Sequence, residues 1–418
     1  MKLTSTITIA FALALGCQAQ RKDKPRDEVD PSQLVSRAED PSAVATTTPQ
    51  PQATPPTVPA ARLPLPPLPD PLPGVRKDVT SIVGSAWRAA IADLDGDGDR
   101  EIVLVDSKQM RVVDPSGREL ATVAVARGIQ ALVAADIDGD RHAEIIAGWG
   151  VTRDHMGTKA AFTVHRLQKG RLSEETVLAP ETTRQDVVAI VPMPDAGSVL
   201  LAYFDSKYVV SSVVAKRSAH GWETSKLASI RTATSYARGD VDGDGAIDLV
   251  IGRVYGDDKG LDGDAFVLAS DGTRKRIPTT RGLRSLAVAD GDGDGRPEVF
   301  IGDGWHQNYG DNARGLLTWA RPAGNAFTSE LIENTAGQYA IERIVPATID
   351  GKPAIVTVGS NYVRVFQRTG GAWRGLTIAG IARDVAVGDL DGVPGDEILI
   401  VGEKSETISL RDVTWSDR

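Results

Sequence analysis

Three observations predict an all-β fold, a seven-bladed β-propeller. First, an acidic loop between two apolar runs recurs along the chain, at intervals of about 50 residues or about twice that length. Second, the segments between these loops are short, alternating or β-branched runs that end at Gly or Asp, which is typical of strands. Third, no long amphipathic helix pattern competes with them. A repeat of this length suits a propeller blade of four short strands.

The composition is that of an acidic globular protein with a single cysteine. The 418 residues are 41% hydrophobic and 25% charged, which is enough to bury a substantial core. The formal net charge is -9 and no stripe of Lys or Arg stands out, so we expect no nucleic-acid partner. Cys17 is the only cysteine, which excludes an intramolecular disulfide and a cysteine-based zinc site.

Residues 1–16 have the pattern of a signal peptide for export. Lys2 precedes an apolar run over residues 7–15 that is too short to span a bilayer, and Gly16 and Cys17 follow it. The segment Ala14-Leu15-Gly16-Cys17 resembles the lipobox of bacterial lipoproteins, although its leucine lies two residues before the cysteine instead of three. The resemblance implies lipidation of Cys17 and anchoring in the bacterial cell envelope, on the outer membrane because Gln18 and not Asp follows. An ordinary secretory signal with an incidental cysteine is the alternative, and export follows from both.

Residues 17–75 are predicted to form a disordered tether between the lipid and the folded domain. From Asp40 to about Gly74 the chain is dominated by Pro, Thr and Ala. Proline removes backbone donors and favours the extended polyproline II conformation, which behaves as a semi-rigid spacer. Proline-dependent binding of an adaptor protein is the alternative use of such a tract.

The repeats occupy residues 76–418. Five acidic loops begin at Asp93, Asp136, Asp240, Asp290 and Asp389, and successive starts are 43, 104, 50 and 99 residues apart. Because two of these intervals are about twice the others, we expect two eroded repeats inside them. Residues 188–201 and 344–356 keep the apolar-loop-apolar pattern and lose the acids. Counting them gives seven units with a mean spacing near 49 residues.

Two features place the strands within the ring. The strand before each acidic loop is rich in Ala and Gly, which suits the crowded innermost position of a blade. The seventh unit ends at Arg418 without a convincing outer strand, whereas residues 77–83 precede the first inner strand. Since an open ring would leave aggregation-prone edges, we expect this N-terminal strand to close the last blade.

The four complete acidic loops are predicted to bind metal. Acids occupy positions 1, 3, 5 and 9 of a nine-residue stretch, with Gly at position 4 to permit the bend. An Asp-Gly turn without metal is the alternative for any single loop, but four matches in phase with a repeat favour metal. The predicted ligands are Asp93, Asp95, Asp97 and Glu101; Asp136, Asp138, Asp140 and Glu144; Asp240, Asp242, Asp244 and Asp248; and Asp290, Asp292, Asp294 and Glu298.

Calcium is the predicted cofactor. It accepts six to eight oxygen ligands in irregular geometry, whereas magnesium demands stricter octahedral order. Transition metals are disfavoured because no His or Cys cluster accompanies the acids. The fifth loop keeps Asp389, Asp391 and Glu397 but has Val393 at position 5, followed by Pro394, so its site is expected to be weak or lost.

The loop pattern Asp-x-Asp-Gly-Asp-Gly-x-x-Asp/Glu resembles the FG-GAP/VCBS repeats of integrin α-subunit propellers and many bacterial surface proteins. The resemblance covers roughly residues 77–418. It implies that the calcium loops join the first and second strands of a blade, and that calcium there is mainly structural. Functions in this family range from adhesion and lectin-like binding to a few polysaccharide lyases, so the fold does not decide among them.

A ligand is expected on the face opposite the acidic loops, where three long connections between second and third strands emerge. They combine scarce aromatic residues with amide and guanidinium donors, which suits a glycan or protein ligand. Packing of the aromatic residues between blades is the alternative. The candidate ligand-binding residues are Trp149, Tyr255, Trp305, His306, Asn308, Tyr309 and Arg314.

The sequence therefore predicts a calcium-binding, membrane-tethered module for binding or adhesion. An envelope scaffold subunit that holds a protein partner is the alternative. Catalysis is not expected, because the chain has no nucleophile elbow, His-Glu-x-x-His motif or phosphate-cradling glycine loop. A polysaccharide lyase that uses His155 or His306 is the enzymatic alternative.

Overall fold

The computed structural model describes residues 76–415, except 83, 126–127, 151–159, 182–183, 185, 194, 196, 207–208, 255–262, 270–271, 280–282, 304–314, 325, 336–339, 360–361 and 414. The described residues form strands and connections and contain no helix. Accordingly, no helix in this part of the chain is long and apolar enough to cross a membrane.

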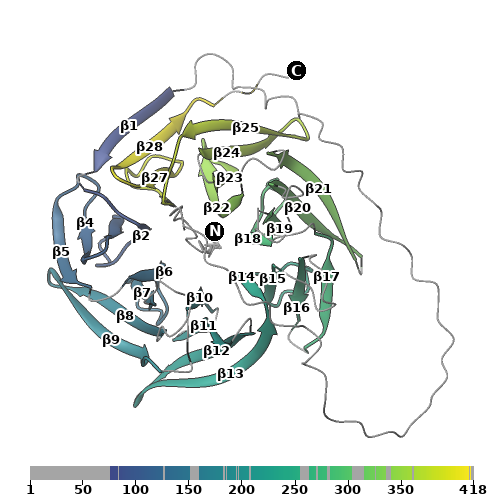
Figure 1. The fold of residues 1–418 in the computed structure, drawn as a ribbon. Helices are drawn as coiled ribbons and strands as arrows, with labels where there is room; N and C mark the ends of the chain where they lie inside the picture. The colour runs from purple at the N-terminus through teal and green to yellow at the C-terminus, as the bar shows by residue number, and fades with distance from the viewer. Residues whose placement is uncertain are drawn as a thin grey trace, which may run out of the picture. The chain divides into compact units, whose positions relative to one another are not determined.

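Seven antiparallel sheets of four strands form the blades of a propeller (Figure 1). Blade 1 contains β2 (Arg88–Ala92), β3 (Glu101–Val105), β4 (Gln109–Val113) and β5 (Glu119–Ala124). Blade 2 contains β6 (Ile129–Ala135), β7 (Glu144–Trp149), β8 (Ala161–Gln168) and β9 (Arg171–Leu178). Blade 3 contains β10 (Val187–Pro192), β11 (Ser198–Ser206), β12 (Val209–Ser218) and β13 (Gly221–Arg231). Blade 4 contains β14 (Ala233–Gly239), β15 (Asp248–Arg253), β16 (Asp264–Leu268) and β17 (Arg274–Ile277).

The remaining blades complete the ring. Blade 5 contains β18 (Leu283–Ala289), β19 (Glu298–Asp303), β20 (Leu316–Ala323) and β21 (Ala326–Asn334). Blade 6 contains β22 (Ile341–Ile349), β23 (Lys352–Gly359), β24 (Tyr362–Thr369) and β25 (Ala372–Ala379). Blade 7 contains β26 (Asp384–Gly388), β27 (Glu397–Val401), β28 (Ser405–Arg411) and β1 (Arg76–Ile82). The predicted seven-bladed β-propeller is therefore confirmed.

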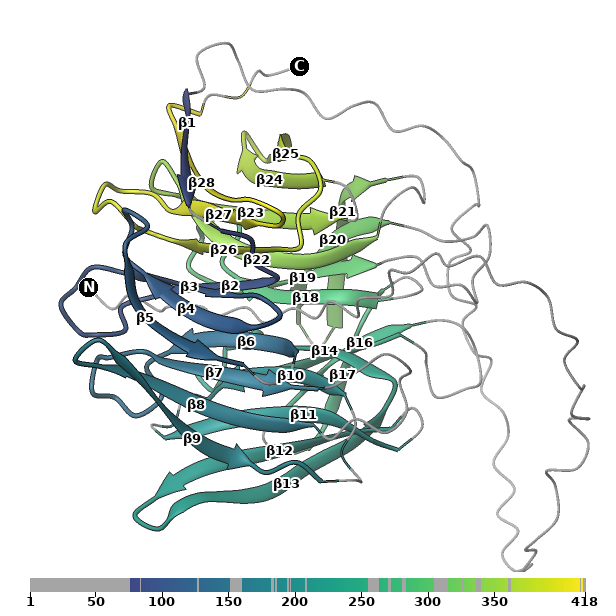
Figure 2. The same ribbon diagram turned by 60° about the vertical axis from the view of Figure 1, so that its left-hand side comes forward.

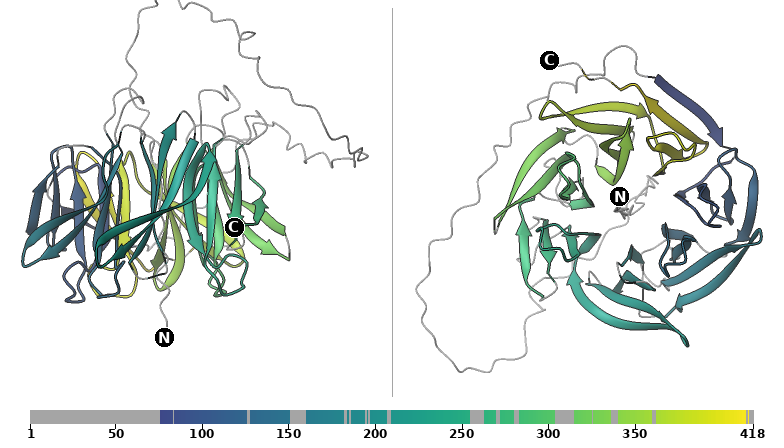
Figure 3. Two further views of the ribbon diagram at one scale, coloured as in Figure 1. Left: turned by 90° about the horizontal axis from the view of Figure 1, so that it is seen from below. Right: turned by 180° about the vertical axis from the view of Figure 1, so that it is seen from behind.

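The first strand of each blade faces the axis of the ring. These strands contact one another in the order β2, β6, β10, β14, β18, β22 and β26, and β26 contacts β2 again (Figure 3). In antiparallel sheets the turn after the first strand and the turn after the second strand lie at opposite ends of the blade. The acidic loops follow the first strands, so they lie at the end of the blades opposite the end at which the second strands finish (Figure 2).

The last sheet combines the two ends of the described chain. Its strand order is β1-β28-β27-β26, and β1 pairs antiparallel with β28 from Arg76↔Arg411 to Ile82↔Ser405. The outermost strand of blade 7 thus comes from the segment that precedes blade 1 in sequence.

The core lies between neighbouring blades. All residues of the second strands β3, β7, β15, β19 and β27 are buried, because each of these strands has a blade on both faces. Between blades 5 and 6, the rings of Trp319 and Trp373 meet edge to face with centroids 5.3 Å apart.

Crowding between the inner strands explains their small residues. A Cβ on Gly239 would lie 2.4 Å from Val288 Cγ1 of the next blade, and one on Gly388 would lie 2.7 Å from Ile91 Cγ2. Such approaches leave no room for a larger side chain.

The two eroded repeats are complete blades with short first turns. In blade 6 only Asp350 and Gly351 separate β22 from β23, and their φ angles of 49° and 69° are those of a two-residue hairpin turn. Blade 3 connects β10 to β11 through residues 193–197. These turns are too short to gather several acids around one point.

Candidate metal centres

The acidic loops are called loops 1, 2, 4, 5 and 7 after their blades, and span residues 93–101, 136–144, 240–248, 290–298 and 389–397. Backbone amides shape them around the carboxylates. In loop 5, Asp290 accepts the amides of Gly293 and Gly295 on its two oxygens, at 2.7 and 2.9 Å. Asp294 accepts the amide of Arg296 at 2.8 Å. The two glycines have φ angles of 79° and 89°, which a residue with a Cβ adopts only at a steric cost.

Loops 1, 2 and 4 repeat this pattern. The acid at position 1 accepts the amides of positions 4 and 6, and the acid at position 5 accepts the amide of position 7. Position 6 is Gly98 in loop 1 and Gly245 in loop 4, but it is Arg141 in loop 2, with a φ of 74°. Arg141 is therefore a strained exception to the glycine that this position favours.

In every acidic loop, oxygens from three acids lie within 4.8 Å of one another. Loops 1, 2, 4 and 7 unite positions 1, 3 and 9, whereas loop 5 unites positions 1, 3 and 5. The predicted ligands Asp97, Asp140, Asp244 and Glu298 lie in the same loops but outside these groups. The groups are Asp93, Asp95 and Glu101; Asp136, Asp138 and Glu144; Asp240, Asp242 and Asp248; Asp290, Asp292 and Asp294; and Asp389, Asp391 and Glu397.

The acid at position 9 begins the second strand and is buried in all five loops. One of its oxygens accepts the amide of position 2, as Glu298 does from Gly291 at 2.9 Å. Burial, together with the charge of the loop aspartates, raises the pKa of Glu298 to about 8, although this hydrogen bond acts in the opposite direction. The same causes raise the pKa of Glu101 to about 7. The position-9 acid is thus a buried carboxylate among other acids, an environment that a bound cation would stabilise.

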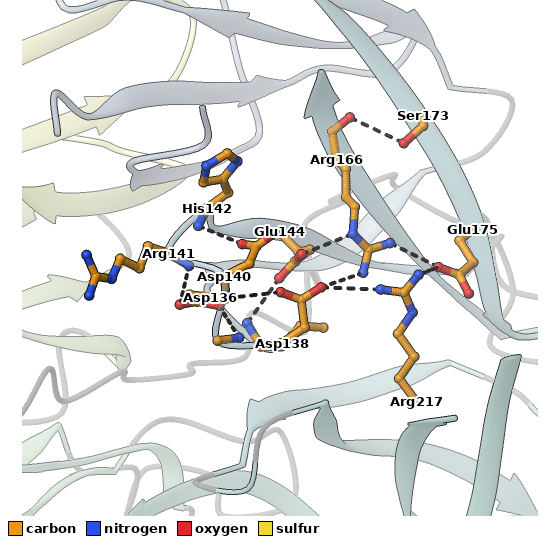
Figure 4. A network of polar contacts seen from close by, with 12 residues as sticks. Asp136, Asp138, Asp140, Arg141, His142, Glu144, Arg166, Ser173, Glu175 and Arg217 are labelled. Atoms are coloured by element: carbon orange, nitrogen blue, oxygen red, sulfur yellow. Dashed lines mark hydrogen bonds and ion pairs between the residues drawn. The ribbon is translucent and has the colours of Figure 1, made fainter. Parts of the chain in front are cut away.

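In loop 2, two arginines partly neutralise the acids (Figure 4). Arg166, on β8, donates to Glu144 at 3.1 Å, to Asp138 at 3.4 Å and to Glu175 at 2.9 Å. Arg217, from β12 of blade 3, donates to Asp138 at 3.2 Å. Burial nevertheless raises the pKa of Glu144 to about 7, with Asp138 adding to the rise and Arg166 opposing it.

Basic side chains also contact position 3 of loops 4 and 5. Lys275 Nζ, from β17, donates to Asp242 at 2.5 Å, and Arg368, from β24 of the next blade, donates to Asp292 at 3.0 Å. Sequence reasoning missed these residues because they lie 33 and 76 positions away from their partners. Strand register and blade packing alone bring them to the loops.

Loop 7 differs from the others in two respects. Pro394 occupies position 6 and has no amide to donate to Asp389. Arg411 donates to Asp391 at 2.9 Å and to Glu397 at 3.0 Å. A guanidinium group thus bridges two acids of loop 7 that would otherwise face a cation.

Loop 1 differs from loop 7 in the ion pairs of its acids. Among the described residues, no basic side chain forms an ion pair with Asp93, Asp95, Asp97 or Glu101. Its acids therefore have the greatest unbalanced negative charge of the five loops.

Of the residues predicted to bind a ligand, only Trp149 lies in the described part of the chain. Its ring is buried between blades 1 and 2, and Nε1 donates to Thr163 Oγ1 at 2.6 Å. This placement favours packing over ligand contact. Tyr255, Trp305, His306, Asn308, Tyr309 and Arg314 lie outside the described residues, as does Cys17.

No protein-family model and no curated protein matches the chain. Among solved structures, that of BBS1N in complex with ARL6DN, soaked with lead, is similar with a TM-score of 0.51 and 14% identity, over 84% of this chain and 98% of that one. The same complex soaked with mercury has a TM-score of 0.53 and 12% identity, over 81% and 96%. The extracellular domain of the putative one component system BT4673 from B. thetaiotaomicron has a TM-score of 0.46 and 11% identity, over 79% and 39%. The first two similarities show the propeller fold alone.

Proposed function

We propose that the chain is a calcium-binding propeller of the FG-GAP/VCBS type, with one Ca²⁺ in each of loops 1, 2, 4 and 5. The buried acid at position 9, with its raised pKa, carries the proposal together with the three acids whose oxygens lie within 4.8 Å of one another in each loop. Oxygen ligands in an irregular loop suit calcium, and no His or Cys belongs to the five groups of acids.

The proposed role of calcium is structural. Positions 1 and 3 follow the inner strand, and position 9 opens the second strand, so a cation that binds all three would tie the two strands together. It would also relieve the repulsion among the acids. A cation that binds only the folded state stabilises it by about 2.7 kcal/mol per site when its free concentration is 100 times Kd.

Thermal unfolding in calcium, in magnesium and in chelator tests this proposal. We expect the highest unfolding temperature in calcium and the lowest in chelator. In loop 1, Asp95→Asn should reduce the gain from calcium, whereas Asp99→Asn should leave it unchanged, because the position-7 side chain lies outside the group of acids. An unfolding temperature that does not respond to calcium would refute the proposal.

We also propose that β1 closes the ring. Its pairing with β28 covers the edge that blade 7 would otherwise expose to solvent. A chain without residues 17–82 should unfold at a lower temperature, and aggregate more readily, than a matched chain without residues 17–75. Equal stability of the two chains would show that the pairing makes no difference to the ring.

The propeller is proposed to act as a binding or adhesion module for a glycan or protein ligand. The long second-to-third-strand connections, at the end of the blades opposite the acidic loops, support a ligand face there. Glycan-array binding would favour a lectin-like module, and a stoichiometric co-purifying envelope protein would favour a scaffold. Unsaturated products from acidic polysaccharides would instead favour a lyase.

Export and lipid anchoring complete the proposal. They are supported by the signal pattern of residues 1–16 and the cysteine that follows it. Cys17→Ala should abolish incorporation of labelled fatty acid and release the protein from the membrane fraction. Unchanged fractionation of this variant would contradict the lipid anchor.

A further inference from the structure

A cavity of about 520 Å³ lies among the inner strands, on the axis of the ring. Its walls come from blades 1, 2, 4, 6 and 7, and consist mainly of Ala, Val, Leu, Ile and Pro side chains. Its charged lining residues are Asp93, Arg100, Asp136, Arg141, Arg238 and Arg343. Four guanidinium groups from four different blades therefore line a cavity of the size that small-molecule sites have.

The two acids in the lining do not balance these charges. Asp93 accepts the amides of Gly96 and Gly98, and Asp136 accepts those of Gly139 and Arg141. Both also belong to the candidate metal groups of loops 1 and 2. They contribute to the acidic loops, and neither forms an ion pair with a lining arginine among the described residues.

Arg238, on β14, is a half-buried arginine of the cavity lining. Among the described residues it forms no ion pair, and its buried Nε has no hydrogen-bond acceptor. Most arginines in a protein interior are paired with an acid, because an unpaired buried charge is costly. Arg238 lines the cavity from an inner strand, where it lies between the small residues Ala237 and Gly239 in sequence.

Arg343, on β22, is paired on one side only. It forms an ion pair with Asp384 of blade 7, whose second oxygen accepts the amide of Ala89 at 3.2 Å. Its Nε has no acceptor among the described residues. Arg88 adds a further positive charge near Arg343, and among the described residues it donates to the carbonyls of Gln130 and Trp87.

Other acids near the cavity are already engaged. Asp396 accepts the amide of Thr348 at 2.6 Å, and the positive charge of Arg100 acts to lower its pKa. The charge of Arg284 likewise acts to lower the pKa of Glu342. The lining of the cavity therefore holds more positive than negative groups, although the protein as a whole is acidic.

We propose that this cavity binds a small molecule or ion that carries a sulfate or phosphate group. The planar fork of a guanidinium group donates two parallel hydrogen bonds to such an oxyanion. A carbonyl or hydroxyl group of a ligand could accept a hydrogen bond but could not neutralise the charge of the guanidinium group. The volume of the cavity, about 520 Å³, accommodates a small molecule. The cavity adjoins loops 1 and 2, which contribute Asp93, Arg100, Asp136 and Arg141 to its lining.

Calorimetric titration of the full chain with inorganic sulfate and with inorganic phosphate tests the proposal, at a calcium level too low to precipitate phosphate. We expect saturable binding of at least one anion. Its affinity should fall about tenfold or more in Arg238→Gln, since a charge-assisted hydrogen bond is lost. Arg276→Gln, which removes an exposed guanidinium group on β17, is the matched control and should bind as the unchanged chain does.

Arg141→Gln provides a second variant on an exposed loop residue, in case Arg238→Gln impairs folding. Preference for phosphate over sulfate, or the reverse, would assign the group that the natural ligand carries. The proposal is overturned if neither anion binds saturably, or if Arg276→Gln weakens binding as much as the two cavity variants do.

Discussion

Calcium binding should release protons, because burial raises the pKa of the position-9 acids of loops 1, 2 and 5 to about 7 or 8. At pH 7 a group with a pKa of about 8, such as Glu298, is about 90% protonated, and a group with a pKa of about 7 is about half protonated. Glu101 and Glu144 belong to the second kind. A carboxylate must lose its proton to bind a metal ion. Loops 1, 2 and 5 together should therefore release about two protons at pH 7.

Isothermal titration calorimetry in buffers of different ionisation enthalpy measures this number directly. The heat of binding varies linearly with the buffer enthalpy, and the slope is the number of protons released. The calcium affinity of loop 5 should also be about tenfold weaker at pH 7 than at high pH, because the proton competes for Glu298.

Glu298→Gln should reduce the proton release by about one, since glutamine has no proton to give up. Glu223→Gln, on the exposed outer strand β13, is the control and should leave the release unchanged. A slope close to zero at pH 7, with calcium bound, would refute the argument, because it would mean that the position-9 acids are already ionised in the metal-free protein.

Three further predictions concern stability. In chelator, the folded-state pKa of Glu298 lies above its ordinary value of 4.5, so protonation of this group favours folding. The unfolding temperature should therefore fall as the pH rises from about 5 to about 8.5. Calcium should abolish this fall. Arg141→Gly should raise the free energy of unfolding by about 1 kcal/mol in denaturant titrations, because it relieves the left-handed backbone, whereas Arg100→Gly should not. Gly239→Ala should cost about 1–3 kcal/mol through overpacking against Val288, whereas Gly380→Ala, with no atom within 4 Å of its Cβ, should cost nothing; equal effects would contradict the packing argument.

The blade count could be predicted from the sequence because the acidic loop recurs once per blade. The two eroded repeats were recognisable from their apolar runs, and the structure confirms them as β10–β11 and β22–β23. Glycine at position 4 of the acidic loops was also predictable, because the bend requires a positive φ. These properties are local: they depend on residues that lie within about ten positions of one another.

The neighbours of the acidic loops could not be predicted in this way. Arg166, Arg217, Lys275, Arg368 and Arg411 contact the acids only because strand register and blade packing place them there. A signal for the axial cavity is present in the sequence, since Arg238 separates the small residues Ala237 and Gly239 of an inner strand. Its meaning depended on which other side chains shared the axis.

The sequence by itself therefore determined the repeat, the strands and the acidic loops, since each is encoded within one unit. Only the tertiary structure decided how charge is distributed among those loops and along the axis. In loop 7 Arg411 bridges two acids, whereas in loop 1 no described basic residue does so. Contacts between blades join residues far apart in the chain, and no pattern within one repeat records them.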